Sequence, residues 1–158
     1  MTDTMTIRPL GRVEKTGEGA FVQLREEFWP GLHGLQEFSH VIILWWGEEE
    51  PLEGSSPGPG KISLTVDLPY APGVQAGLFA TRSPLRPNSV NITVAGLRET
   101  DPARGRIKLD ELDAFAGTAV IDIKPYYGCL DRVQDYRQPQ WVPAEWGEWY
   151  YPLPEETW

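Results

Sequence analysis

A proline-bounded loop carries two arginines that could bind an anion. Residues 79–88 read FATRSPLRPN, which places Arg82 and Arg86 four positions apart. Pro84 and Pro87 restrict the backbone around them, and a rigid loop loses less entropy when it binds a ligand. The planar donor fork of arginine matches a carboxylate or a phosphate. The segment therefore predicts an anion-binding loop, with exposed arginines on a purely structural loop as the alternative.

A second candidate is a charged pair in an apolar strand. Asp122 and Lys124 alternate with Ile121 and Ile123, and Pro125 ends the run. Side chains two residues apart on a strand share one face. The pair is predicted to be either a surface ion pair, worth under about 1 kcal/mol, or one wall of a site.

Strand patterns dominate the elements that must position these residues. Residues 62–68 and 90–97 alternate apolar and polar side chains, which predicts half-buried strands. Residues 41–46 form a continuous β-branched and aromatic run, which predicts burial on both faces. Further short strands are predicted at 7–13, 21–24, 77–80, 106–109 and 118–123. Many short strands separated by Pro and Gly indicate a barrel or a sandwich.

Helical patterns are weak, and the C-terminal tail is unusual. Residues 30–38 could hold one or two turns, and no GxGxxG or P-loop motif occurs. We predict an all-β fold: a compact single-domain β-barrel over 1–137, with few short helical turns, and an irregular tail over 138–158. The tail holds four of the seven tryptophans. Because disordered tails are poor in aromatics, it is expected to pack on its own barrel, a partner subunit or a ligand.

Charge and composition limit the function. The net charge of -9 argues against tight non-specific binding of nucleic acid, although residues 82–108 carry six basic and two acidic side chains. This stretch predicts either solvated strand faces or a local basic site. No apolar run approaches the roughly 18–20 residues of a membrane helix, and residues 1–8 lack a signal-peptide core, so we expect a cytoplasmic protein. One cysteine and two histidines lead us to expect no metal.

Four motifs in a fixed order resemble the TsaA-like or TrmO family, also called YaeB-like. They are GLxxFSH at 34–40, FATRSPxRPN at 79–88, LDxxxGT at 112–118 and DIKPY at 122–126. The resemblance covers roughly residues 6–127. It implies a β-barrel that binds S-adenosylmethionine, usually as a homodimer, and methylates N6-threonylcarbamoyladenosine in tRNA.

The resemblance also implies roles for single residues. The implied cofactor-binding residues are Gly47, Glu48, Arg82, Ile92, Asp113, Ala114, Phe115 and Ala116. The family's DIKPY signature implies a catalytic region, in which Asp122 is the candidate base for a weakly nucleophilic nitrogen and Lys124 or Tyr126 orients the acceptor. Arg86 and Asn88 are the candidates for substrate binding or for contact with the cofactor carboxylate.

The chain departs from the family pattern near the site. Ser89, Val90 and Asn91 stand where relatives have Pro-Ile-Gly, and Ala116 stands where they have Asp. The resemblance also leads us to expect no counterpart of the C-terminal domain of longer bacterial members. These departures leave two alternatives to a tRNA methyltransferase: a methyltransferase of the same fold with a small-molecule acceptor, and a non-catalytic S-adenosylmethionine-binding module.

Overall fold

The computed structural model describes residues 5–47 and 63–149. These residues form two compact units, the first from 5–47 and 89–131 and the second from 63–88 and 132–149. Glu48, the predicted start of a strand at Ile62, and the last part of the tail lie outside the described residues.

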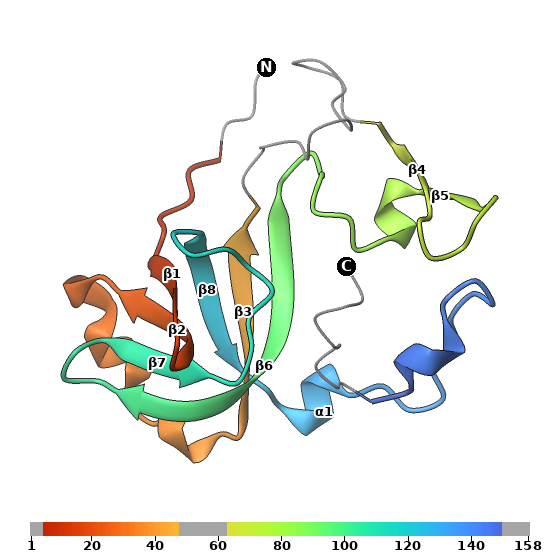
Figure 1. Ribbon diagram of the computed structural model, residues 1–158. Coiled ribbons are helices and arrows are strands. Elements are labelled where there is room, and N and C mark those ends of the chain that lie inside the picture. The colour runs from red at the N-terminus through yellow and green to blue at the C-terminus, as the bar shows by residue number, and fades with distance from the viewer. Residues whose placement is uncertain (1–4, 48–62, 150–158) are drawn as a thin grey trace. The chain divides into compact units, whose positions relative to one another are not determined.

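The first unit is a closed antiparallel barrel (Figure 1). The pairing closes because β8 returns to β1, with Gly11 opposite Val120. Closure leaves no unpaired sheet edge, and it confirms the predicted all-β barrel. Six of the described strands follow one another around it: β1 (Gly11–Thr16), β2 (Gly19–Leu24), β7 (Arg106–Leu109), β6 (Val90–Asp101), β3 (His40–Trp46) and β8 (Ala119–Pro125).

Alternating side chains of these strands fill the barrel. Val22, Val41, Ile43, Ile107 and Val120, from four different strands, are all fully buried. Each fully buried aliphatic side chain of this size contributes about 1.5–3 kcal/mol relative to an exposed one. The barrel is therefore held by a hydrophobic core to which its strands contribute jointly.

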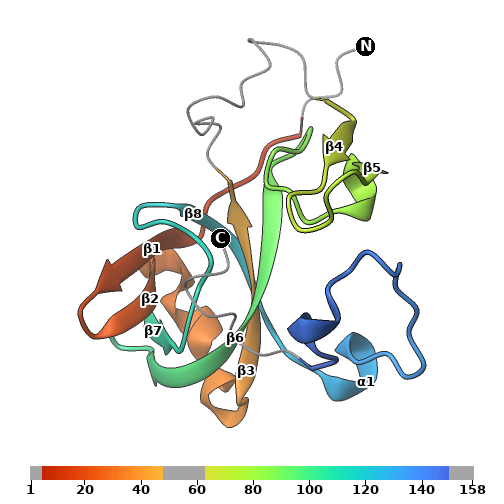
Figure 2. The ribbon, with the colours of Figure 1, turned by 45° about the vertical axis from the view of Figure 1, so that its right-hand side comes forward.

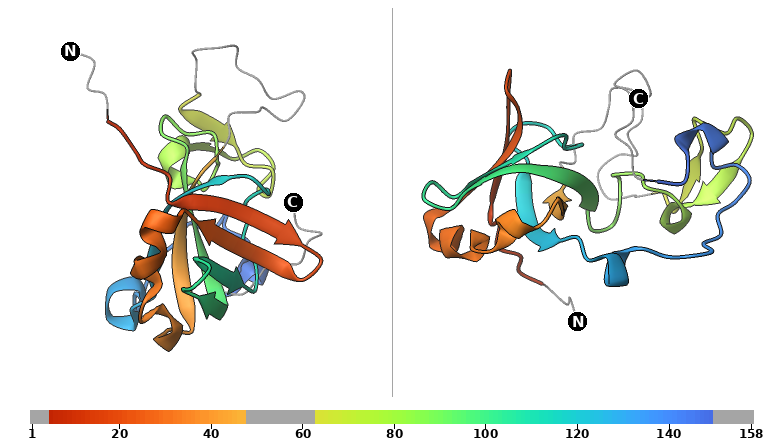
Figure 3. Two further views of the ribbon diagram at one scale, coloured as in Figure 1. Left: turned by 90° about the vertical axis from the view of Figure 1, so that its left-hand side faces the viewer. Right: turned by 90° about the horizontal axis from the view of Figure 1, so that it is seen from below.

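Two 3₁₀ helices between β2 and β3 add to this core. They are η1 (Glu26–Leu32) and η2 (Leu35–Glu37), and Gly34 separates them with φ of 85°. Leu32 and Leu35 are buried in the barrel's core cluster. The pair confirms the short turns predicted over 30–38, and Figure 3 shows them in orange beside the strands. A short helix, α1 (Gly128–Asp131), follows β8.

The second unit is built from much shorter elements. Its hairpin pairs β4 (Thr65–Asp67) with β5 (Gln75–Gly77), and the 3₁₀ helix η3 (Leu78–Ala80) follows directly (Figure 2). The predicted strand over 77–80 is therefore wrong beyond Gly77. The chain turns there because the Leu78 carbonyl accepts hydrogen bonds from both the backbone N–H and the hydroxyl of Thr81.

The described part of the tail belongs to the second unit and packs against Tyr70, between β4 and β5. The ring of Tyr70 lies 4.9 Å from that of Trp146 and 6.2 Å from that of Trp141, measured between centroids. Trp146 ends a 3₁₀ helix, η4 (Ala144–Trp146). The described part of the tail is therefore packed, as its aromatic content predicts, but these ring contacts are with Tyr70 of the second unit rather than with the barrel, partner subunit or ligand named in the prediction.

Candidate functional site

Three predicted cofactor segments meet at one end of the barrel. The antiparallel register sets Trp46 opposite Val90 and Trp45 opposite Val120, so β3 ends where β6 and β8 begin. Gly47, just beyond β3, donates its N–H to the Ser89 carbonyl at 2.7 Å. Gly47 follows β3, Ile92 is the third residue of β6 and the turn over 113–116 precedes β8, so all three belong to the same end of the barrel although they are far apart in the sequence. Figure 1 shows this end of β3, β6 and β8 uppermost.

The turn before β8 is anchored by buried residues and presents exposed ones. Ala114 is buried and donates its N–H to the carbonyl of buried Leu112 at 2.9 Å. The side chain of Arg12, on β1, donates to the Gly117 carbonyl at 2.7 Å. Between these anchors Asp113 is exposed and Phe115 is 84% exposed. The turn thus offers a carboxylate and an aromatic ring from a fixed backbone.

Ile92 adds a second exposed apolar side chain. It lies on β6 opposite Leu44 and is 47% exposed. Phe115 and Ile92 both belong to the end of the barrel at which the predicted cofactor residues converge.

Asp122 and Lys124 form an ion pair on the outward face of β8. The Lys124 Nζ lies 2.6 Å from the Asp122 Oδ2, and the Ile123 N–H donates to the Asp122 Oδ1 at 2.9 Å. The hydrogen bond and the charge of Asp122 raise the pKa of Lys124 above its usual value of 10.5. Lys124 is therefore a cation at neutral pH, and it holds the carboxylate in one orientation.

The predicted catalytic residues are spread along β8 and the residue that follows it. Asp122 lies opposite Leu44, whereas the Tyr126 N–H donates to the carbonyl of His40, the first residue of β3. At a rise of about 3.3 Å per residue, Asp122 is about 10 Å from the start of β8 and Tyr126 is about 23 Å from it. The strand brings Asp122 nearer to the convergent end and carries Tyr126 to the opposite one.

The two predicted arginines of the second unit have different surroundings. The Arg86 Nη1 donates to the Thr81 carbonyl at 3.0 Å, and its guanidinium lies 5.8 Å from the centre of the Phe79 ring. Arg82 is exposed and makes no hydrogen bond or ion pair with any described residue. Asn88 is also exposed. Arg86 therefore ties its own loop together, whereas Arg82 is directed to solvent.

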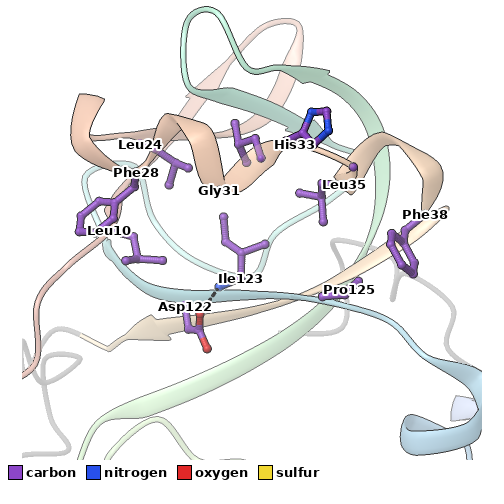
Figure 4. Close-up of a pocket in the computed structure, with 12 residues that line it drawn as sticks. Leu10, Leu24, Phe28, Gly31, His33, Leu35, Phe38, Asp122, Ile123 and Pro125 are labelled. Atoms are coloured by element: carbon purple, nitrogen blue, oxygen red, sulfur yellow. Dashed lines mark hydrogen bonds between the residues drawn. The ribbon is translucent and has the colours of Figure 1, made fainter.

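The structure also contains an apolar pocket that the sequence did not predict. Its volume is about 430 Å³, and its walls come from Leu10, Leu24, η1, η2 and the end of β8. Asp122 is one of the residues that line this pocket, and Figure 4 shows its carboxylate directed away from the leucine and phenylalanine side chains. No local pattern could reveal it, because its walls join segments that are distant in the sequence.

Three of the six basic residues over 82–108 form ion pairs with described residues. Arg98 lies 3.4 Å from Asp110, Arg104 lies 3.3 Å from Asp101, and Arg106 lies 3.1 Å from Glu14. These pairs fit the interpretation of this stretch as solvated strand faces. In the part of the chain that the structure describes, no three His, Cys, Asp or Glu side chains group as metal ligands. No helix over the same residues is long and apolar enough to cross a membrane.

Comparison with known proteins shows what the chain is similar to. The family model for the tRNA-methyltransferase O N-terminal domain matches residues 9–132. A tRNA (adenine(37)-N6)-methyltransferase of Homo sapiens is 37% identical over 108 residues, which make up 68% of this chain and 22% of the human protein. An S-adenosyl-L-methionine-binding protein of Archaeoglobus fulgidus is 32% identical over 119 residues, covering 75% of this chain and 77% of that protein.

A solved structure agrees with this match. The crystal structure of TrmO from Pseudomonas aeruginosa superposes with a TM-score of 0.64 at 26% sequence identity, covering 89% of this chain and 62% of that chain. The chain therefore spans less than a quarter of the human relative and less than two thirds of the bacterial structure.

Proposed function

Since this chain belongs to the tRNA-methyltransferase O (TrmO) family, we propose that it binds S-adenosylmethionine and uses it to methylate an acceptor. The observation that carries the proposal is the convergence of Gly47, Ile92 and the turn over 113–116 at one end of the barrel. The family resemblance implies that these residues bind the cofactor.

The chemistry of these residues fits the cofactor. Exposed Phe115 and Ile92 offer apolar surface for an adenine ring. The exposed Asp113 carboxylate can accept hydrogen bonds from hydroxyl or ammonium groups. In the second unit, the donor fork of Arg82 matches a carboxylate. Ala116 supplies no charge to the turn, so Asp113 is its only carboxylate.

The bound cofactor supplies a methyl group on a sulfonium, and the chain's own residues align the acceptor and accept its proton. We assign the base to Asp122, whose carboxylate is held by the Lys124 ammonium and the Ile123 N–H. Lys124 orients Asp122 rather than acting as a base, because it is protonated at neutral pH. Tyr126, which follows β8 and lies about 23 Å from the start of that strand, would contact only an extended acceptor.

For the acceptor we propose N6-threonylcarbamoyladenosine in tRNA, with the enzyme acting as a homodimer. The name of the human relative supports the tRNA, and the position of Tyr126 at the far end of β8 suits a large acceptor. The net charge of -9 and the paired arginines favour the alternative of a small-molecule acceptor. The name of the archaeal relative supports a binding module without catalysis as a third candidate.

The first experiment is a calorimetric titration of S-adenosylmethionine into the purified protein. We expect micromolar binding that weakens at least tenfold in Arg82→Ala, because a charge-assisted contact is worth about 1.5–3 kcal/mol. Arg104→Ala is the matched control, since Arg104 is an exposed arginine paired with Asp101. The absence of binding at millimolar cofactor would overturn the proposal.

A second experiment separates the acceptors. Methyl transfer is followed with labelled cofactor to threonylcarbamoylated tRNA and to the same tRNA without the modification. Transfer to the modified tRNA alone, abolished in Asp122→Asn, supports the tRNA assignment and the base. Cofactor binding without transfer to either tRNA would leave the small-molecule enzyme and the binding module as the candidates.

A further inference from the structure

We propose that Arg86 is a positioning residue, which shapes its loop so that Arg82 can bind the carboxylate of the cofactor. This role replaces the direct substrate contact expected from the sequence. It rests on the proposed function, because the carboxylate belongs to S-adenosylmethionine.

The first support is that the Arg86 guanidinium faces the carbonyls of its own loop. Its Nη1 lies 3.0 Å from the Thr81 oxygen, 3.4 Å from that of Leu78 and 3.5 Å from that of Ser83. Phe79, over whose ring the guanidinium lies, belongs to the same loop. A side chain that donates to carbonyls on both sides of Arg82 limits the conformations open to that residue.

Thr81 strengthens the same arrangement. Thr81 is buried, and its hydroxyl donates to the Leu78 carbonyl at 2.8 Å. The Thr81 hydroxyl oxygen also accepts a hydrogen bond from the Ser83 N–H at 3.3 Å. Arg82 therefore sits between two residues whose backbone polar groups are directed into the loop. Its own side chain is left exposed. The loop is pre-organised in the sense that lowers the entropy cost of binding.

The chemistry of the ligand decides what Arg82 would contact. S-adenosylmethionine carries one carboxylate, which the arginine fork can bind with two parallel hydrogen bonds. If Arg86 acts only through Arg82, its substitution should lower the affinity for ligands that carry this carboxylate and leave the affinity for ligands without it unchanged. Methylthioadenosine, which has the nucleoside but no amino-acid part, is the natural comparison.

The test is a double-mutant cycle measured by calorimetry with both ligands. Lysine cannot reproduce the planar guanidinium, so Arg86→Lys should weaken S-adenosylmethionine about tenfold and change methylthioadenosine less than about twofold. In the Arg82→Ala background, Arg86→Lys should have no further effect, because the residue through which it acts is gone. Thr81→Val should likewise lower the affinity for S-adenosylmethionine and change that for methylthioadenosine little.

Several outcomes would overturn the proposal. Additive losses in the double variant would mean that Arg86 contacts the cofactor directly. Equal weakening of both ligands would indicate a general structural role. Unchanged amide hydrogen exchange over residues 79–85 in Arg86→Lys would show that Arg86 does not order the loop. If the wild-type protein binds methylthioadenosine and S-adenosylmethionine equally well, the contact between Arg82 and the cofactor carboxylate is refuted and the proposed function still stands. If it binds neither ligand, the proposed function is overturned as well.

Discussion

The interactions that stabilise the barrel differ in kind from those that stabilise the second unit. The barrel has a closed ladder of strands around many fully buried aliphatic side chains. Among the described residues of the second unit, the paired strands are three residues long and the buried aliphatic side chains are Leu68 and Leu78. Hydrogen bonds from the Thr81 and Arg86 side chains and a few aromatic contacts also stabilise this unit.

This difference bears on function. A barrel stabilised by many side chains can keep its fold while the exposed residues of its end turns change. A unit stabilised by a few specific contacts can be altered by one substitution. The loop that carries Arg82 lies in the second kind of unit.

The largest expected effect is on the barrel core. Ile43 is fully buried, so Ile43→Ala should lower the free energy of unfolding by about 2–5 kcal/mol, measured by urea denaturation. Ile92→Ala is the matched control, since Ile92 is 47% exposed, and it should cost under about 1 kcal/mol. Equal losses from the two substitutions would contradict the assignment of inward and outward faces.

A smaller effect is expected in the second unit. Trp146→Ala removes the ring contact with Tyr70, and such a contact is worth about 0.5–1.5 kcal/mol beyond the buried area. Amide hydrogen exchange should therefore accelerate around Tyr70. Trp149→Ala, which removes a tryptophan that is 73% exposed, should leave these amides unchanged. The packing of the tail would be refuted if both variants behaved alike.

The smallest effect concerns the charged pair on β8. Asp122 raises the pKa of Lys124, so in Asp122→Asn that pKa should fall back toward 10.5, as followed by NMR of the lysine side chain. Since the folded-state pKa is raised, the stabilisation from the pair is complete below pH 10.5 and is lost as the pH rises through the folded pKa. A Lys124 titration that Asp122→Asn does not change would argue against the ion pair in solution.

Some of the fold could be predicted from local pattern alone. The runs at 41–46 and 106–109 match β3 and β7 to within one residue, because their apolar side chains pack in the core whichever strands lie beside them. The alternation at 62–68 is equally regular, but the strand is confined to Thr65–Asp67 and Leu64 is 61% exposed. Alternation predicts a strand only where a partner strand and a core exist to receive it.

The candidate site shows the same division. The spacing of Asp122 and Lys124 predicted their shared face, since side-chain direction in a strand depends on parity alone. The spacing could not show that Tyr126 lies at the opposite end of the barrel from the 113–116 turn, because that depends on which strands pair with β8. Nor could it show that Arg86 faces the carbonyls of its own loop.

The sequence by itself determined the all-β class, the family and the residues that could take part in chemistry, since these follow from side-chain type, order and period. Only the tertiary structure decided that β3, β6 and β8 bring Gly47, Ile92 and Phe115 to one end of the barrel. The physical reason is that register and closure arise from hydrogen bonds between strands that are distant along the chain, and no local pattern encodes their geometry.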